Sequence, residues 1–168
     1  MNMITKILMA LSALVIILGL GVSAYFSFQY NQEKHPFSSS DFGVALEGYD
    51  IISYFAENKA QKGDEKYQVE AYGSRWYFSS LAHQQDFIRD GDLFLPEYGG
   101  YDPYGIAISA ITRKSNPQIW TMREGKLYLF FSFETQRLWL DNYPENLARS
   151  DLNWPTLERK LNYIEERK

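Results

Sequence analysis

Few residues in this chain are equipped for acid–base or metal chemistry. The 168 residues include no Cys and two His, and only His83 lies beyond the polar stretch 29–41. Any imidazole that acts as an acid, a base or a metal ligand in the folded part is therefore His83. A lone histidine on the polar side of a predicted helix is, however, typical of a solvated surface residue.

A loop rich in tyrosine and glycine is the second candidate for a site. Residues 95–105, called the tyrosine–glycine loop from here on, contain three glycines that allow close backbone approach. Phenols and carboxylates ligate hard metals or line small-molecule clefts. The alternative is that the glycines shape an irregular connection and the tyrosines pack against the sheet. The candidate ligand-binding residues are Glu97, Tyr98, Tyr101, Asp102 and Tyr104.

Asp102 and His83 are the candidate metal ligands, with Glu97 as a further oxygen donor. Without thiolates or several imidazoles, copper or zinc would be held poorly, whereas hard cations prefer more carboxylates than this loop offers. We therefore expect no cofactor and, if a metal ion binds, only weak binding through oxygen.

Composition and motifs exclude several classes of protein. A formal net charge of -4 and a pI near 5.2 argue against nucleic acid as a partner, because phosphate binding needs clustered Lys and Arg. The absence of Cys excludes disulfides, thiolate metal sites and Cys nucleophiles. The sequence contains no phosphate-binding glycine loop, no GxSxG elbow and no HExxH helix. It does not indicate any protein partner.

The N-terminal segment 1–28 reads as a signal peptide or a membrane anchor. Residues 7–24 carry no charge and follow Lys6. Their length suits a bilayer-spanning helix, with residues 7–28 contacting the membrane, while Val22-Ser23-Ala24 offers a cleavage site. Residues 29–41 are predicted to be a tether. The expected location is the cell envelope, either anchored and facing the periplasm or extracytoplasmic space, or soluble in the periplasm after cleavage at Ala24.

Residues 42–168 are predicted to form one α+β domain, a small antiparallel sheet of hairpins flanked by helices and preceded by the N-terminal hydrophobic helix. Alternating apolar residues predict hairpins near 66–78 and 119–131. No internal repeat is visible in the sequence. The side chains expected to be mostly buried are Trp76, Phe78, Trp120, Tyr128 and Trp139.

Capping residues and apolar stripes predict the helices. Asp50 is expected to cap a short helix through Phe55, and Ser79 or Ser80 a helix that buries Leu81, Phe87 and Ile88. Residues 106–111 suit either a strand or a helix. Ser132 is expected to cap a helix that Pro144 ends, and Pro155 to open a last helix with Leu157, Leu161 and Ile164 on one face.

Three stretches of the chain together resemble the YHS domain-containing protein family, in its exported bacterial form. Residues 48–55 (GYDIISYF) are similar to the family's GYDPVAYF, residues 76–80 (WYFSS) to WYFAS, and residues 96–105 (PEYGGYDPYG) to PQYGGYCAYG. The resemblance extends over residues 42–157. It implies a compact α+β domain for which metal binding or sensing is usually proposed, without a defined enzymatic activity.

Two departures from the family pattern affect the expected chemistry. The Tyr-His-Ser triplet that names the family corresponds to Tyr77-Phe78-Ser79, and the loop cysteine corresponds to Asp102. The chain is thus a cysteine-less variant to which thiolate metal chemistry does not carry over. The sequence favours a non-enzymatic binding or accessory domain. The alternative is an enzyme that uses His83, or Asp102 and Glu97, for acid–base chemistry in a tyrosine-lined cleft.

Overall fold

A computed structural model describes residues 37–38 and 43–165 of the chain, with side chains as far as residue 161. The hydrophobic segment 1–28 and most of the tether 29–41 lie outside the described residues. Within the described ranges, every helix is too short or too polar to cross a bilayer.

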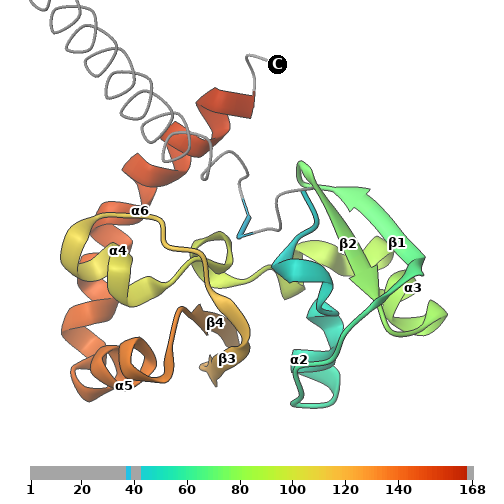
Figure 1. Ribbon diagram of the computed structural model, residues 1–168, viewed down its shortest axis with the longest axis horizontal. Coiled ribbons are helices and arrows are strands. Elements are labelled where there is room, and N and C mark those ends of the chain that lie inside the picture. The colour runs from blue at the N-terminus through green and yellow to red at the C-terminus, as the bar shows by residue number, and fades with distance from the viewer. Residues whose placement is uncertain (1–36, 39–42, 166–168) are drawn as a thin grey trace, which may run out of the picture. The chain divides into compact units, whose positions relative to one another are not determined.

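The described chain is built from helices and two hairpins, so the predicted α+β class is confirmed (Figure 1). The hairpins form two separate two-stranded antiparallel sheets instead of one sheet. The first half of the chain contributes η1 (Leu46–Gly48), α2 (Ile51–Ala56), β1 (Asp64–Ala71), β2 (Ser74–Phe78), α3 (Leu81–Asp90) and η2 (Gly91–Phe94). The second half contributes η3 (Glu97–Gly100), α4 (Pro103–Ser109), β3 (Asn116–Arg123), β4 (Lys126–Phe130), α5 (Phe133–Asp141) and α6 (Tyr143–Glu165).

The two halves repeat the same order of elements, a repeat that was not visible in the sequence; each half is called a copy from here on. The second hairpin begins at Asn116, 52 residues after Asp64, and its strands β3 and β4 have the same lengths as β1 and β2. Even the irregular register recurs, between Asp64 and Gln68 in the first sheet and between Asn116 and Trp120 in the second. The same spacing of 52 residues relates the segment from η1 to α3 to the segment from η3 to α5, without an insertion or a deletion.

The copies share the residues that the backbone geometry requires and little else. Both hairpins turn through a residue and a glycine with positive φ, Tyr72-Gly73 and Glu124-Gly125, as tight hairpin turns demand. The pairs that match at this spacing are Gly48/Gly100, Tyr49/Tyr101, Asp50/Asp102, Lys62/Lys114, Gly73/Gly125, Phe78/Phe130, Ser80/Ser132 and Gln84/Gln136. Because the remaining positions differ, the repeat is hard to see in the sequence alone.

Strand β4 connects the two hydrophobic cores. Leu127 and Leu129 belong to the core of the first copy, while Tyr128 and Phe130 belong to the core of the second. All four are buried, whereas β2 buries alternate residues only. Successive side chains of a strand point to opposite faces, so β4 is covered on both sides. The two copies thus form one packed body.

The predicted core is largely confirmed. Trp76, Phe78, Tyr128 and Trp139 are buried, and Trp120 is half-buried with its ring 5.3 Å from that of Tyr54 in an edge-on contact. Ser80 and Ser132 cap α3 and α5 as predicted, through bonds from the backbone N–H groups of His83 and Thr135.

The predicted buried stripe of α3 is only partly right. Phe87 is buried, but Leu81 and Ile88 are 54% and 65% exposed. A ten-residue helix lying on a two-stranded hairpin has a narrow contact, and Phe87 alone reaches Trp76 and Phe78 in that contact. The apolar pattern predicted a wider stripe than a small sheet can cover.

Both proline predictions near the C-terminus are wrong. Helix α5 ends at Asp141, and Pro144 lies in the first turn of α6, where a missing N–H costs little. Pro155 lies inside α6 and does not begin a helix. Helix α6 continues because it packs along α4 (Figure 1), and it buries Leu157 and Leu161 on one face as predicted. The side chain of Ile164 lies outside the described residues.

The segment that suited either a strand or a helix is helical over residues 106–109. Its helix, α4, begins at Pro103, within the residues that the sequence assigned to the tyrosine–glycine loop.

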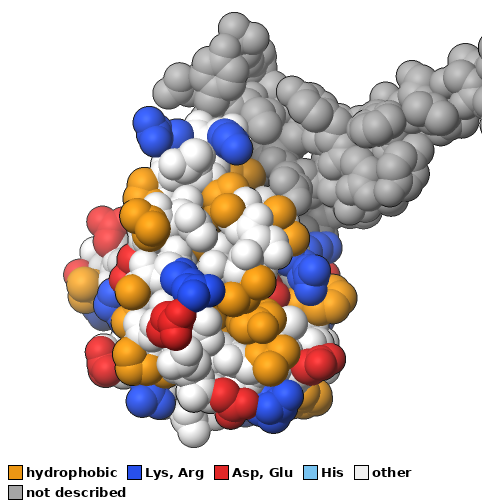
Figure 2. All heavy atoms as spheres, turned by 90° about the vertical axis from the view of Figure 1, so that its left-hand side faces the viewer, with side chains coloured by type: hydrophobic (Ala, Val, Ile, Leu, Met, Phe, Trp, Pro, Cys, Tyr) orange, Lys and Arg blue, Asp and Glu red, His pale blue; other side chains and the backbone are white. Residues whose placement is uncertain are grey.

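The side of the molecule formed by α4, α5 and α6 carries apolar side chains among charged ones (Figure 2). The exposed apolar residues on these elements and the segments next to them include Ile108, Ile111, Phe131, Phe133 and Leu152. Phe131 is partly covered by Arg113, whose guanidinium carbon lies 4.9 Å from the ring centroid.

Gly100 is a position where the fold needs glycine, and Gly125 provides a matched control. Gly100 has φ +75°, and a Cβ there would lie 2.9 Å from Leu46 and 3.2 Å from Leu129, whereas Gly125 has φ +77° and open space around it. Gly125→Ala is expected to lower the free energy of unfolding by about 1–2 kcal/mol through backbone strain alone. Gly100→Ala adds a clash and should cost about 1–3 kcal/mol more. Urea denaturation measures both variants, and equal losses would contradict the packing described here.

Candidate functional site

The tyrosine–glycine loop folds into η3 and the first turn of α4. Glu97 lies at its start and pairs with Lys126, whose Nζ is 3.2 Å from Oε2. Tyr98 is buried with φ +55°, and its hydroxyl donates to Oδ1 of Asp151 on α6 at 2.7 Å. The loop is therefore tied to both β4 and α6.

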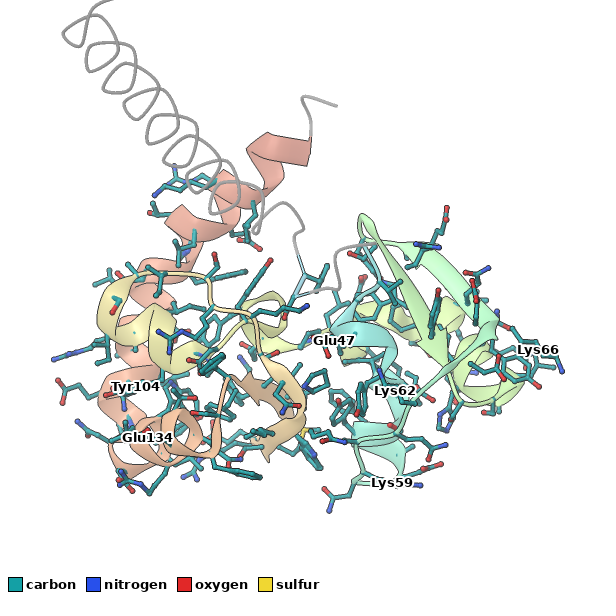
Figure 3. The ribbon with its side chains drawn as sticks, in the orientation of Figure 1. Glu47, Lys59, Lys62, Lys66, Tyr104 and Glu134 are labelled. Atoms are coloured by element: carbon teal, nitrogen blue, oxygen red, sulfur yellow. The ribbon has the colours of Figure 1, made fainter. Side chains whose placement is uncertain are left out.

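Of the other three candidate residues of the loop, Tyr101 and Tyr104 lie in or against the second core, to which Tyr98 also belongs, and Asp102 is a buried helix cap. Tyr101 is buried, with its ring 6.4 Å from that of Trp154. Asp102 is fully buried and caps α4, accepting the backbone N–H of Gly105 at 3.3 Å. Tyr104, labelled in Figure 3, is half-buried and packs against the second core. The two tyrosines thus fit the alternative that tyrosines of the loop fill the core, and Asp102 serves as a helix cap.

A cleft of about 520 Å³ lies beside the loop and is lined by Glu97 and Tyr98. Its described lining includes three carboxylates, those of Glu97, Asp151 and Glu158, and no basic side chain. Four aromatic rings complete the wall, from Phe37, Tyr72, Tyr98 and Trp154. The cleft therefore combines negative charge with aromatic surface.

Both phenols in the cleft are engaged with carboxylates. Burial, and then the bond to Asp151, raise the pKa of Tyr98 far above its usual value, so its hydroxyl remains a donor. A hydrogen bond to Asp92 raises the pKa of Tyr72 in the same direction. Because these hydroxyls are occupied, a ligand would meet the aromatic rings and the carboxylates, of which Asp151 already accepts the Tyr98 hydroxyl and Glu97 already pairs with Lys126.

His83 is not the solvated surface residue that the sequence predicted. Its side chain is 13% exposed, and Nδ1 lies 2.7 Å from Oδ2 of the fully buried Asp50. Asp50 also accepts the backbone N–H of Ile52, which caps α2 as predicted, and both the N–H and the hydroxyl of Ser79. Since Asp50 accepts all of these bonds, Nδ1 of His83 is the donor.

The second ring nitrogen of His83 faces a different group. Nε2 lies 3.8 Å from Oε1 of Glu57, a residue at the end of α2 whose side chain is 43% exposed. In the neutral form of the ring, a proton on Nδ1 leaves the lone pair on Nε2. Ser79 Oγ is 3.3 Å from Nδ1, not Nε2, so the three side chains do not form a nucleophile–base–acid relay.

Asp102 occupies in the second copy the position of Asp50 in the first. The positions equivalent to Ser79 and His83 are Phe131 and Thr135. Burial raises the pKa of the Asp102 carboxyl above its usual range, and bonds from Phe131 N–H and Thr135 only partly offset this. Oδ1 of Asp102 has no hydrogen-bond partner among the described residues.

The structure does not bring the predicted metal ligands together. His83 contacts Asp50 and Glu57 in the first copy, whereas Asp102 lies beside Gly105 and Thr135 in the second. In the described part of the chain, no group of three or more histidine or acidic side chains is arranged to hold a metal ion.

Sequence reasoning missed several residues of these sites: Glu57, Asp151, Trp154 and Glu158, and the role of Asp50 beyond capping. One signal was available, because Gly48-Tyr49-Asp50 recurs as Gly100-Tyr101-Asp102 and the serine caps recur at the same spacing. Comparing the two would have aligned His83 with Thr135, while the contact of His83 with Asp50 emerges only in the folded chain.

Comparisons with known proteins give no significant match to a family model, to a curated protein or to a solved structure. The resemblance to the YHS domain-containing family therefore stays a prediction from the motifs.

Replacing Asp50 or Asp102 with asparagine is expected to change the free energy of unfolding in different ways. Asp50→Asn should lower the free energy of unfolding by about 2–4 kcal/mol at neutral pH, because a carboxylate with four donors is lost. Asp102→Asn should be neutral or stabilising there, because it removes a poorly satisfied buried charge.

The raised pKa of Asp102 also predicts the sign of a pH effect. A carboxyl whose pKa is higher in the folded state contributes most to stability below its unfolded value, and this contribution is lost as the pH rises through the folded pKa. The wild type should therefore gain stability relative to Asp102→Asn between about pH 7 and about pH 4.5. Urea denaturation at both pH values tests this, and a pH-independent difference would contradict it.

Proposed function

We propose that the chain is an exported or membrane-anchored, non-enzymatic binding domain of YHS type, and that the cleft beside the tyrosine–glycine loop binds a small organic cation. The observation that supports this proposal is the lining of the cleft, in which three carboxylates face four aromatic rings. Such a lining suits an amine or a quaternary ammonium group.

The charges of the cleft favour a cation. Glu97 is partly neutralised by Lys126 at its edge, which leaves Asp151 and Glu158 on α6 as the main source of negative charge. Both are exposed, so their attraction in water is modest. Charge supplies long-range attraction, and another contact has to supply most of the affinity.

The aromatic rings supply that contact. Trp154 is half-buried and stands edge-on to Tyr98, with ring centroids 5.9 Å apart, so its position is fixed by packing. A cation over a Trp or Tyr face is stabilised by about 0.5–2 kcal/mol. The cleft volume of about 520 Å³ accommodates a small ligand.

Acid–base catalysis is the second candidate, and the orientation of His83 by Asp50 favours it. The other two groups proposed for it are less available, since Asp102 is fully buried and Glu97 is paired with Lys126. A catalytic role for His83 would not depend on the aromatic cleft, so the two candidates separate by mutation.

Titration of the full chain with choline and with spermidine tests the binding proposal, with glycerol as the uncharged control. We expect saturable binding of a cation, monitored by tryptophan fluorescence and calorimetry. Trp154→Leu should weaken it at least about five-fold, and Glu158→Gln about two- to five-fold. Glu134→Gln on α5 makes the same charge change outside the cleft lining (Figure 3) and should leave binding unchanged. Equal affinity for glycerol, or no effect of Trp154→Leu, would contradict the proposal.

The location in the cell envelope rests on residues 7–24 and has a separate test. Fractionation of cells followed by N-terminal sequencing should find an anchored form that retains residues 1–24 in the membrane fraction. A soluble form that begins at Tyr25 would instead favour a signal peptide. Recovery of the uncleaved chain from the cytosol would contradict both.

A further inference from the structure

The two copies allow the structural role of His83 to be separated from any further role. Asp50 and Asp102 have the same place in the two copies, and each is met by the side chain three residues after the capping serine, His83 or Thr135. Thr135 lies beside Asp102 and completes a capping box with Ser132, whose carbonyl accepts the Thr135 hydroxyl at 3.0 Å. A threonine therefore suffices for the fold at this position, and the imidazole of His83 exceeds what the fold requires.

The imidazole adds an oriented nitrogen. Asp50 holds Nδ1 at 2.7 Å, so the ring is fixed, and the side chain keeps 13% of its surface exposed. A carboxylate behind a histidine fixes the tautomer and raises the basicity of the opposite nitrogen, an arrangement common behind metal-binding histidines.

Glu57 places a carboxylate beside that nitrogen. Oε1 lies 3.8 Å from Nε2. Two ligand atoms that each lie about 2.0–2.2 Å from one metal ion are separated by about 3–3.4 Å, so a small rotation of the exposed Glu57 side chain is enough. The position equivalent to Glu57 in the second copy is Ser109, so both groups are specific to the first copy.

We propose that His83 Nε2 and Glu57 form a weak binding site for a late first-row divalent metal ion, with Cu²⁺ held more tightly than Zn²⁺. One imidazole and one carboxylate suit these ions, and Cu²⁺ binds such donors most strongly. Water completes the coordination sphere, which makes the affinity modest. Asp50 is a positioning residue in this site because it acts through His83. The site is separate from the organic-cation cleft and does not depend on the proposed function.

The test is titration of the full chain, made without an affinity tag, with Cu²⁺ and then Zn²⁺, followed by calorimetry and electron paramagnetic resonance. We expect one equivalent of Cu²⁺ with nitrogen coordination, and weaker binding of Zn²⁺. His83→Thr copies the second half of the chain and preserves a partner for Asp50. It should abolish nitrogen coordination and weaken binding at least about ten-fold, and Glu57→Gln should weaken it several-fold.

His35→Gln is the matched control, because His35 in the tether is the other histidine of the chain. Binding that survives this change supports the proposal, and binding that is lost with His35→Gln but kept in His83→Thr overturns it. If His83→Thr does not fold, paramagnetic broadening of the wild type by Cu²⁺ decides. Broadening centred on residues near Glu57 and His83 supports the site, and broadening elsewhere, or the absence of stoichiometric binding, overturns it.

Discussion

A buried carboxylate at the start of a short helix is the interaction on which each copy of the fold depends. Asp50 and Asp102 each cap the helix that follows and reach the end of a hairpin and the first turn of the next helix. Three elements far apart in the chain are thereby held at one point. A carboxylate in the interior is unfavourable unless donors surround it, so the neighbouring backbone has little freedom to move. This requirement explains why Gly-Tyr-Asp and the capping serines match between otherwise different halves.

The same frame has acquired different surroundings in its two copies. In the first copy, four donors satisfy Asp50, and its histidine partner places Nε2 3.8 Å from Oε1 of Glu57. In the second copy, Asp102 is less well satisfied, and the loop before it contributes Glu97 and Tyr98 to the wall of a cleft. Helix α6, which has no counterpart in the first copy, supplies the opposite wall. Repetition of a stable frame thus leaves room for two sites of different chemistry.

Local features of the sequence predicted much of the fold. The hairpins follow from alternating apolar residues and their Gly turns, and the caps at Asp50, Ser80 and Ser132 follow from residue type. The features of the fold that the sequence did not predict depend on tertiary contacts. Pro155 reads as a helix start, yet α4 supports an unbroken α6 across it. The partner of His83 is 33 residues away, beyond the reach of an argument from helical spacing. The acidic wall of the cleft was missed for the same reason, since Asp151 meets Tyr98 only in the folded chain.

The double coverage of β4 has a consequence for how the molecule comes apart. Leu127 and Leu129 complete one core while Tyr128 and Phe130 complete the other. Removal of this strand would expose both cores at once, so we expect neither copy to be stable without the other. We therefore expect the two copies to unfold together in one cooperative transition, despite the modular appearance of the chain.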